Sequence, residues 1–158
     1  MGNSKIDLIF LRHALADWPD WTGSDDDRPI TEEGKKETHE VAAFLNRQGV
    51  APQKIITSPL PRASQTAEIV ARYIKAPLLT SDCLAKGFDA RQLWKLLKQE
   101  KIESAILVGH EPDFSATIKE VTGGDVKLKK SAVARVRLDP EKMSGRLLWL
   151  FPPAICRS

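Results

Sequence analysis

Short apolar runs alternate with longer amphipathic stretches along this chain. Residues 6–11, 54–57 and 104–108 are short and mostly apolar, which is typical of strands buried in a parallel sheet. Between and after them, apolar residues recur three and four positions apart, as they do on one face of an α-helix. The alternation predicts an α/β protein with a mostly parallel central sheet flanked by helices.

Capping residues indicate where the helices begin and end. Thr31 precedes two glutamates, so its hydroxyl is expected to cap a helix that ends at Gly49. Ser58 is expected to cap the next helix, with Pro59 at its first position, where a missing amide hydrogen costs nothing. The remaining elements are expected as a strand at 77–80, a helix at 90–100 capped by Asp89, a helix ending at Gly123-Gly124, and strands at 132–138 and 146–151.

Length and composition favour one globular domain over residues 1–158, because a chain of this size can bury about two thirds of its unfolded surface. The net charge is only +3, so the chain lacks the excess of basic residues that is typical of a nucleic-acid-binding protein. Cys83 and Cys156 lack the spacing of a metal site. The amino terminus passes straight into a strand of six mostly apolar residues, a run that is too short for a signal peptide or a membrane span. We therefore expect a cytoplasmic monomer without a membrane or nucleic-acid partner.

Basic side chains follow three of the predicted strands. Arg12 and His13 come directly after the first strand, Arg62 lies in the helix that follows the second, and His110 follows the strand at 104–108. The carboxyl ends of parallel strands lie at one edge of the sheet, where open α/β sheets bind ligands. These four side chains could therefore converge on a single anion.

The residue types suit a phosphoryl group. A guanidinium fork matches phosphate oxygens bidentately, which a lysine cannot do, so Arg12 and Arg62 matter as arginines. Nearby positive charge lowers the pKa of a histidine and keeps one ring nitrogen free as a nucleophile. Phosphoryl transfer is mostly a matter of positioning and charge neutralisation, and these groups supply both without a metal.

Four motifs in this order and spacing resemble one family. They are Arg12-His13-Ala14 after the first strand, DRPITEEG at 27–34, SPLPRASQTAE at 58–68 and VGHEP at 108–112. The ordered set is similar to the histidine phosphatase superfamily, and specifically to its SixA-type phosphohistidine phosphatase branch. The resemblance implies a three-layer α/β/α fold of the phosphoglycerate mutase type.

The resemblance also implies roles for the motif residues. His13 would be the nucleophile that becomes a phosphohistidine, and Arg12, Arg62 and His110 would hold the phosphoryl oxygens. Ser58 matches the family's serine before a proline, and a phosphate contact there would add to its capping role. No cofactor or metal is implied. The implied substrate is a phosphohistidine on a histidine-phosphotransfer protein of two-component signalling.

One departure from the family pattern bears on the substrate. Relatives that hydrolyse phosphate esters usually carry a general acid in the loop after the third strand, near a leucine like Leu84. Here residues 84–89 read LAKGFD, so the acid is missing unless Asp82 or Asp89 reaches the site. An alkoxide leaving group needs a proton, whereas a protonated phosphohistidine can leave as neutral imidazole. The departure therefore favours a phosphoramidate.

Other functions stay open at this point. The same chemistry could act on a small phosphorylated metabolite, and a phosphate-binding module without turnover is a different class. A metal hydrolase finds no support, because the third histidine, His39, is expected on a helix surface and no HxH or HExxH spacing occurs. Loop 15–28 decides the depth of the pocket. Its Trp18 and Trp21 are expected to pack half-buried over the strand ends or to line the mouth of the pocket. Its run of three aspartates is expected to be a solvated segment, or beside an anion pocket to repel the wrong substrates or meet a basic partner surface.

Overall fold

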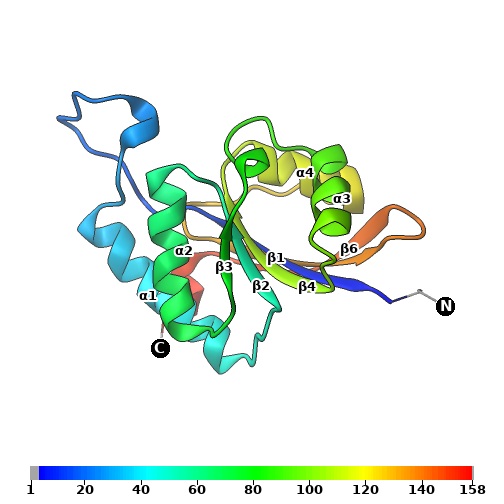
Figure 1. Cartoon of the computed structure of the whole chain (residues 1–158). Helices are drawn as coiled ribbons and strands as arrows, with labels where there is room; N and C mark the ends of the chain where they lie inside the picture. Colours follow the sequence, from blue (N-terminus) through cyan, green and yellow to red (C-terminus); the bar gives the residue numbers. More distant parts are fainter. Residues whose placement is uncertain (1–3, 158) are drawn as a thin grey trace.

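The computed structural model describes residues 4–157, which form one six-stranded sheet and four α-helices (Figure 1). The strands are β1 (Ile6–Arg12), β2 (Lys54–Thr57), β3 (Leu78–Thr80), β4 (Ser104–Gly109), β5 (Val133–Asp139) and β6 (Ser144–Phe151). The helices are α1 (Glu32–Arg47), α2 (Pro61–Tyr73), α3 (Ala90–Gln99) and α4 (Asp113–Thr122), with single 3-10 turns η1 (Asp25–Asp27), η2 (Asp82–Leu84) and η3 (Pro153–Cys156).

The sheet has the strand order β3-β2-β4-β1-β5-β6. The first four strands pair in parallel, and β5 and β6 extend the β1 edge as antiparallel strands. Figure 1 shows α1 and α2 together on one side of the sheet and α3 and α4 on the other. The predicted three-layer α/β/α fold with a mostly parallel sheet is confirmed.

Alternation of side chains along β1 builds a core on each face of the sheet. Leu8 and Phe10 pack with the apolar residues of α3 and α4, while Ile9 and Leu11 pack with those of α1 and α2. All four side chains are buried, as expected for a strand with a helical layer on both sides. The run of apolar residues that predicted a buried strand is thus explained by two separate cores.

Most helix ends lie where the sequence placed them. The Thr31 side chain accepts a hydrogen bond from the amide of Gly34 at 3.0 Å, and Asp89 accepts from Gln92 at 2.9 Å. Gly123 ends α4 with φ +81°, a left-handed conformation that favours glycine.

The predicted start of the second helix is wrong. The helix α2 begins at Pro61, with Leu60 as its N-cap residue and no side-chain cap, so Pro59 lies outside it. The Ser58 hydroxyl instead accepts from the Leu60 amide at 3.1 Å and contacts His110. The Ser58 hydroxyl therefore contacts a residue of the site and does not cap the helix.

Within residues 4–157, no helix combines the length and the apolar composition that crossing a bilayer requires. The expectation that no targeting segment precedes β1 concerns in part residues 1–3, which lie outside the described residues. Cys83 and Cys156 are both free thiols.

Candidate active site

Three strand ends meet at one level of the sheet, because β4 lies between β1 and β2. Arg12 pairs with Gly109 across β1 and β4, and Thr57 pairs with Val108 across β2 and β4. The next residues along each strand are therefore neighbours. The structure brings together all the side chains that the sequence proposed for the site, namely Arg12, His13, Ser58, Arg62 and His110.

His13 is buried and held in one tautomer. Its Nδ1 lies 2.8 Å from the carbonyl oxygen of Ala14, and a carbonyl only accepts, so Nδ1 carries the proton. The other ring nitrogen, Nε2, keeps its lone pair. Burial is the main cause that lowers the His13 pKa to about 3. The Ala14 bond is the next largest effect and opposes it, and the positive charges of His110, Arg62 and Arg12 lower the pKa further. His13 is thus neutral at physiological pH and presents a free nitrogen.

Two arginines near this histidine each have a guanidinium N–H donor without a hydrogen-bond partner among the described residues. Arg12 donates through Nη1 to the carbonyl of Leu128 at 3.0 Å, and Arg62 donates through Nη1 to the backbone carbonyl of Asp25 at 3.1 Å. The Nε atom of each is buried without a hydrogen-bond partner among residues 4–157. Burial lowers both arginine pKa values, yet a guanidinium stays charged in proteins. Buried unpaired donors of positive charge favour an anion as their partner.

His110 completes the cluster from β4. Its ring centroid lies 5.3 Å from that of His13, and its Nε2 lies 2.7 Å from the Ser58 hydroxyl. Burial, then the charges of Arg62 and Lys86, lowers the His110 pKa to about 4. Its Nδ1 is buried with no partner within the described part of the chain, so it too can contact a ligand.

Two glycines of the motifs allow close approach around these side chains. A Cβ atom on Gly109 would lie 2.6 Å from the ring of Phe114, and one on Gly34 would lie 2.5 Å from the carbonyl oxygen of Leu15. Any side chain would push α4 away from the strand that carries His110, or α1 away from the segment after His13.

The sequence analysis missed Thr66. Its hydroxyl accepts a hydrogen bond from the Ala14 amide at 3.0 Å and donates to the Arg62 carbonyl at 2.7 Å. It therefore ties the turn that holds His13 to the helix that carries Arg62. The available signal was its position one helical turn after Arg62 within the SPLPRASQTAE motif.

Glu111 was also missed. Its carboxylate accepts from the amide and hydroxyl of Ser115 and from the amide of Leu128, whose carbonyl holds Arg12. Glu111 thus positions a contact of Arg12, and its charge also acts on the Arg12 pKa.

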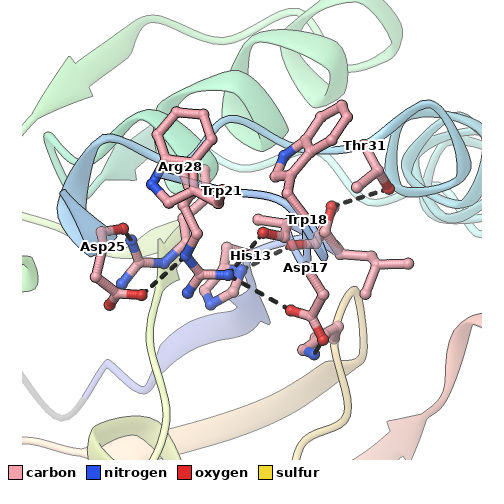
Figure 2. A network of polar contacts seen from close by, with 12 residues as sticks. His13, Asp17, Trp18, Trp21, Asp25, Arg28 and Thr31 are labelled. Carbon is pink, nitrogen blue, oxygen red and sulfur yellow. Dashed lines mark hydrogen bonds and ion pairs between the residues drawn. The ribbon is translucent and has the colours of Figure 1, made fainter. Parts of the chain in front are cut away.

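Loop 15–28 is ordered around Arg28 (Figure 2). The Arg28 guanidinium donates to the Asp25 carboxylate at 2.9 Å and to the Ala16 carbonyl at 2.6 Å, and it lies 3.6 Å from Asp17. Lys130 pairs with the same Asp17 carboxylate at 2.6 Å. The aspartate run is therefore partly engaged in ion pairs.

The two tryptophans are about half-buried, as expected, and they line a surface hollow. Trp18 is 41% exposed and Trp21 is 37% exposed. Their indole N–H groups donate to the backbone carbonyls of Pro29 and Ser24, both at 2.8 Å, so the polar ends are satisfied locally while the rings remain at the surface.

The loop after β3 presents a lysine where a general acid was sought. Lys86 pairs with Asp26 of η1 at 2.5 Å, and both charges act on the His110 pKa. Asp89 is engaged in capping α3, and Asp82 lies in η2. Neither is among the charges within residues 4–157 that shift the pKa of either site histidine. Asp26 is the described carboxylate whose charge acts on the His110 pKa, and the sequence pattern did not single it out.

His39 lies apart from the cluster, on α1, with its Nδ1 2.8 Å from the Tyr73 hydroxyl. Across residues 4–157, no three His, Cys, Asp or Glu side chains are grouped so that they could hold a metal ion. The chemistry open to the cluster is binding of a tetrahedral oxyanion by two arginines and a histidine, next to a neutral histidine with a free lone pair.

Known proteins share this arrangement of sequence and fold. Residues 8–87 match the histidine phosphatase superfamily (branch 1). Phosphohistidine phosphatase SixA of Escherichia coli is 29% identical over 156 residues, covering 94% of each protein. An uncharacterized protein of Picosynechococcus is 33% identical over 144 residues, covering 84% of this chain and 85% of the relative.

A solved structure of the protein histidine phosphatase SixA complexed with tungstate has a TM-score of 0.85 and 26% identity, covering 96% of this chain and 100% of that one. Because the family match spans half of the chain and the fold agrees over nearly its whole length, the chain belongs to the histidine phosphatase superfamily and is a phosphatase of its SixA-type branch.

Proposed function

We propose that this phosphatase removes the phosphoryl group from phosphohistidine on a phosphotransfer protein, through a phosphohistidine intermediate on His13. The observation that carries the proposal is the state of His13. It is neutral, its proton is fixed on Nδ1, and it lies beside two arginines with unpaired donors. A nucleophile with a lone pair inside a positive site is what phosphoryl transfer from an anionic donor requires.

In the first step the Nε2 lone pair of His13 attacks phosphorus, and the bond from phosphorus to the substrate imidazole breaks. The bonding electrons go to the leaving nitrogen, and the proton already on the other ring nitrogen lets the substrate leave as neutral histidine. Arg12, Arg62 and His110 would neutralise the equatorial oxygens during the transfer. In the second step water attacks phosphorus and the bond from phosphorus to His13 Nε2 breaks. The bonding electrons return to Nε2 as its lone pair, and the oxygen and protons of the water leave with inorganic phosphate.

The carboxylates around the site support a phosphoramidate substrate. The ion pair with Lys86 lowers the pKa of Asp26, so this group is ionised at neutral pH and is a poor proton donor. The Asp113 carboxylate accepts from the amides of Gly87 and Phe88, and Asp89 caps a helix. An ester leaving group would lack an acid here, whereas a protonated imidazole needs none.

The relatives agree with this substrate class. The Escherichia coli relative is a phosphohistidine phosphatase, and the solved SixA structure contains tungstate, a tetrahedral oxyanion like phosphate. Both support a phosphoryl pocket of the same kind in this chain.

Rapid-quench labelling tests the proposal. A histidine-phosphotransfer domain carrying ³²P on histidine is mixed with the parent, with His13→Ala, and with His39→Ala as a matched control. We expect an acid-labile, base-stable label on the parent and the control but not on His13→Ala, followed by phosphate release.

A label that persists on His13→Ala would refute the role of His13. If the parent takes no label and leaves the domain and free phosphohistidine intact but hydrolyses an aryl phosphate, the substrate is a small phosphate ester.

A further inference from the structure

Two exposed aromatic rings on loop 15–28 are unused by the proposed chemistry. Among residues 4–157, five large hydrophobic side chains are exposed, and Trp18 and Trp21 are two of them. Single exposed apolar residues are common, whereas neighbouring ones that form a patch are informative about binding. Together with their neighbours these rings line a surface hollow of about 480 Å³, formed by Asp17, Trp18, Pro19, Trp21, Asp25 and Arg28.

The two rings are held in place before any partner binds. Both indole N–H groups are bonded to backbone carbonyls at 2.8 Å. The ring of Trp21 lies against Gly23, where an added Cβ would come within 2.9 Å of it. Rings that are already ordered lose little conformational entropy on binding, which is the property of aromatic anchors at protein interfaces.

The hollow shares a wall with the phosphoryl pocket. Asp25 is one of the residues that line the hollow, and its backbone carbonyl accepts the hydrogen bond from Arg62. Arg28, which organises the hollow, is also the charge that acts most strongly on the Arg62 pKa. Figure 2 shows Trp18 and Trp21 on the loop that Arg28 organises, with His13 beside it. A macromolecule whose phosphoryl group reaches His13 would therefore pass close to the two rings.

The charge around the rings indicates the chemistry of the occupant. Asp20 and Asp27 are exposed, and within the described residues neither forms an ion pair, in contrast to Asp17 and Asp25. An apolar platform on a loop that carries unpaired, exposed carboxylates complements a surface with apolar and basic side chains. A free phosphorylated metabolite, which is anionic, gains nothing from such a surface.

We propose that Trp18 and Trp21, with the exposed Asp20 and Asp27 of the same loop, form the docking surface for the folded protein that carries the phosphohistidine. The partner presents apolar and basic side chains around its phosphorylated residue. The proposal rests on the proposed function and deepens it, since it assigns substrate selection to a surface outside the phosphoryl pocket.

The test compares two substrates that share the reacting bond. One is a histidine-phosphotransfer domain phosphorylated on histidine, and the other is free phosphohistidine. In the double variant Trp18→Ala/Trp21→Ala, we expect kcat/KM for the domain to fall at least about tenfold, mainly through KM, and kcat/KM for free phosphohistidine to stay within twofold. Met143→Ala, which removes an exposed apolar side chain elsewhere, is the matched control and should change neither.

A second variant keeps the test valid if the tryptophan changes disturb the loop. Asp20→Lys/Asp27→Lys leaves the indole bonds and Arg28 untouched. It should lower kcat/KM for the domain, and added salt should then raise that value instead of lowering it. Activity on free phosphohistidine should again be unchanged.

The outcomes separate the two proposals. If kcat/KM falls equally for both substrates in both variants, the loop only supports the pocket. If kcat/KM for the domain does not fall, the domain docks elsewhere on the enzyme. Either result overturns the docking surface. A parent that hydrolyses free phosphohistidine but not the phosphorylated domain also overturns it. A parent that hydrolyses neither refutes the proposed function itself.

Discussion

Replacing Thr66 by valine isolates the hydrogen bond that joins the two halves of the site. Valine keeps the shape of threonine but removes the hydroxyl that accepts from the Ala14 amide at 3.0 Å. Thr66 and Ala14 are both fully buried, so water cannot replace the lost acceptor. The Arg62 carbonyl loses only an additional donor, because the helix still supplies the amide four residues on. One buried N–H group is left unpaired.

The loss of stability follows from this one unpaired N–H group. A buried donor without a partner costs about 1–3 kcal/mol, so we expect the free energy of unfolding to fall by about that amount. For a chain of this size, the melting temperature should drop by about 2–4 °C per kcal/mol. Because the Ala14 carbonyl fixes the ring of His13, kcat for an aryl phosphate should also fall by about tenfold or more. Urea unfolding and steady-state kinetics measure the two effects.

Thr38→Val is the matched control. The Thr38 side chain is also fully buried, but its hydroxyl only donates to the Gly34 carbonyl within α1, at 2.7 Å. Removing this hydroxyl leaves no buried donor without a partner. The free energy of unfolding should therefore change by less than about 1 kcal/mol, and kcat should not change. If Thr66→Val matches Thr38→Val in both measurements, the bond does not position the site and the reasoning is refuted.

Three further predictions concern the charged groups. Arg62→Lys should lower kcat/KM for an aryl phosphate at least about tenfold, since a charge-assisted bond is worth about 1.5–3 kcal/mol; parental activity would contradict the bidentate clamp. Burial holds the pKa of His13 at about 3 and that of His110 at about 4, below the ordinary 6.5, so the unfolded chain binds protons first. The free energy of unfolding should fall as the pH drops from about 6.5 toward 4, by at most about 1.4 kcal/mol per pH unit for each histidine. Urea titrations at several pH values measure this slope. A His110→Asn variant that keeps the parental slope would disprove the prediction. Asp82→Asn and Asp89→Asn should each retain phosphohistidine hydrolysis. Loss of turnover in either variant would instead support a general acid at that position and a phosphate ester as the substrate.

Features that depend on neighbours along the chain could be predicted from the sequence. The apolar runs placed the strands, and the caps Thr31 and Asp89 lie where the pattern put them, because a cap is satisfied by amides three residues away. The alternation of strands and helices implied a parallel sheet, and a parallel sheet brings strand ends to one edge. That was enough to propose Arg12, His13 and His110 as neighbours.

Features that depend on distant segments needed the tertiary structure. The neighbours of Ser58 along the chain predict a helix cap, but the fold brings His110 within 2.7 Å of its hydroxyl. Thr66 has the helical spacing of a core residue, and its bond to Ala14 exists only because α2 packs beside the end of β1. Local pattern cannot encode such pairs, since each partner is selected by the way the elements pack.

The charges and aromatic rings around the pocket follow the same division. The sequence alone determined the residue types available to the site and the sheet edge where they gather. Only the fold decided that Asp26 meets Lys86 across two loops, and that the Trp18 and Trp21 rings stay exposed once local carbonyls satisfy their N–H groups. The physical reason is that an ion pair or an exposed ring depends on distance in space, which composition and periodicity do not specify.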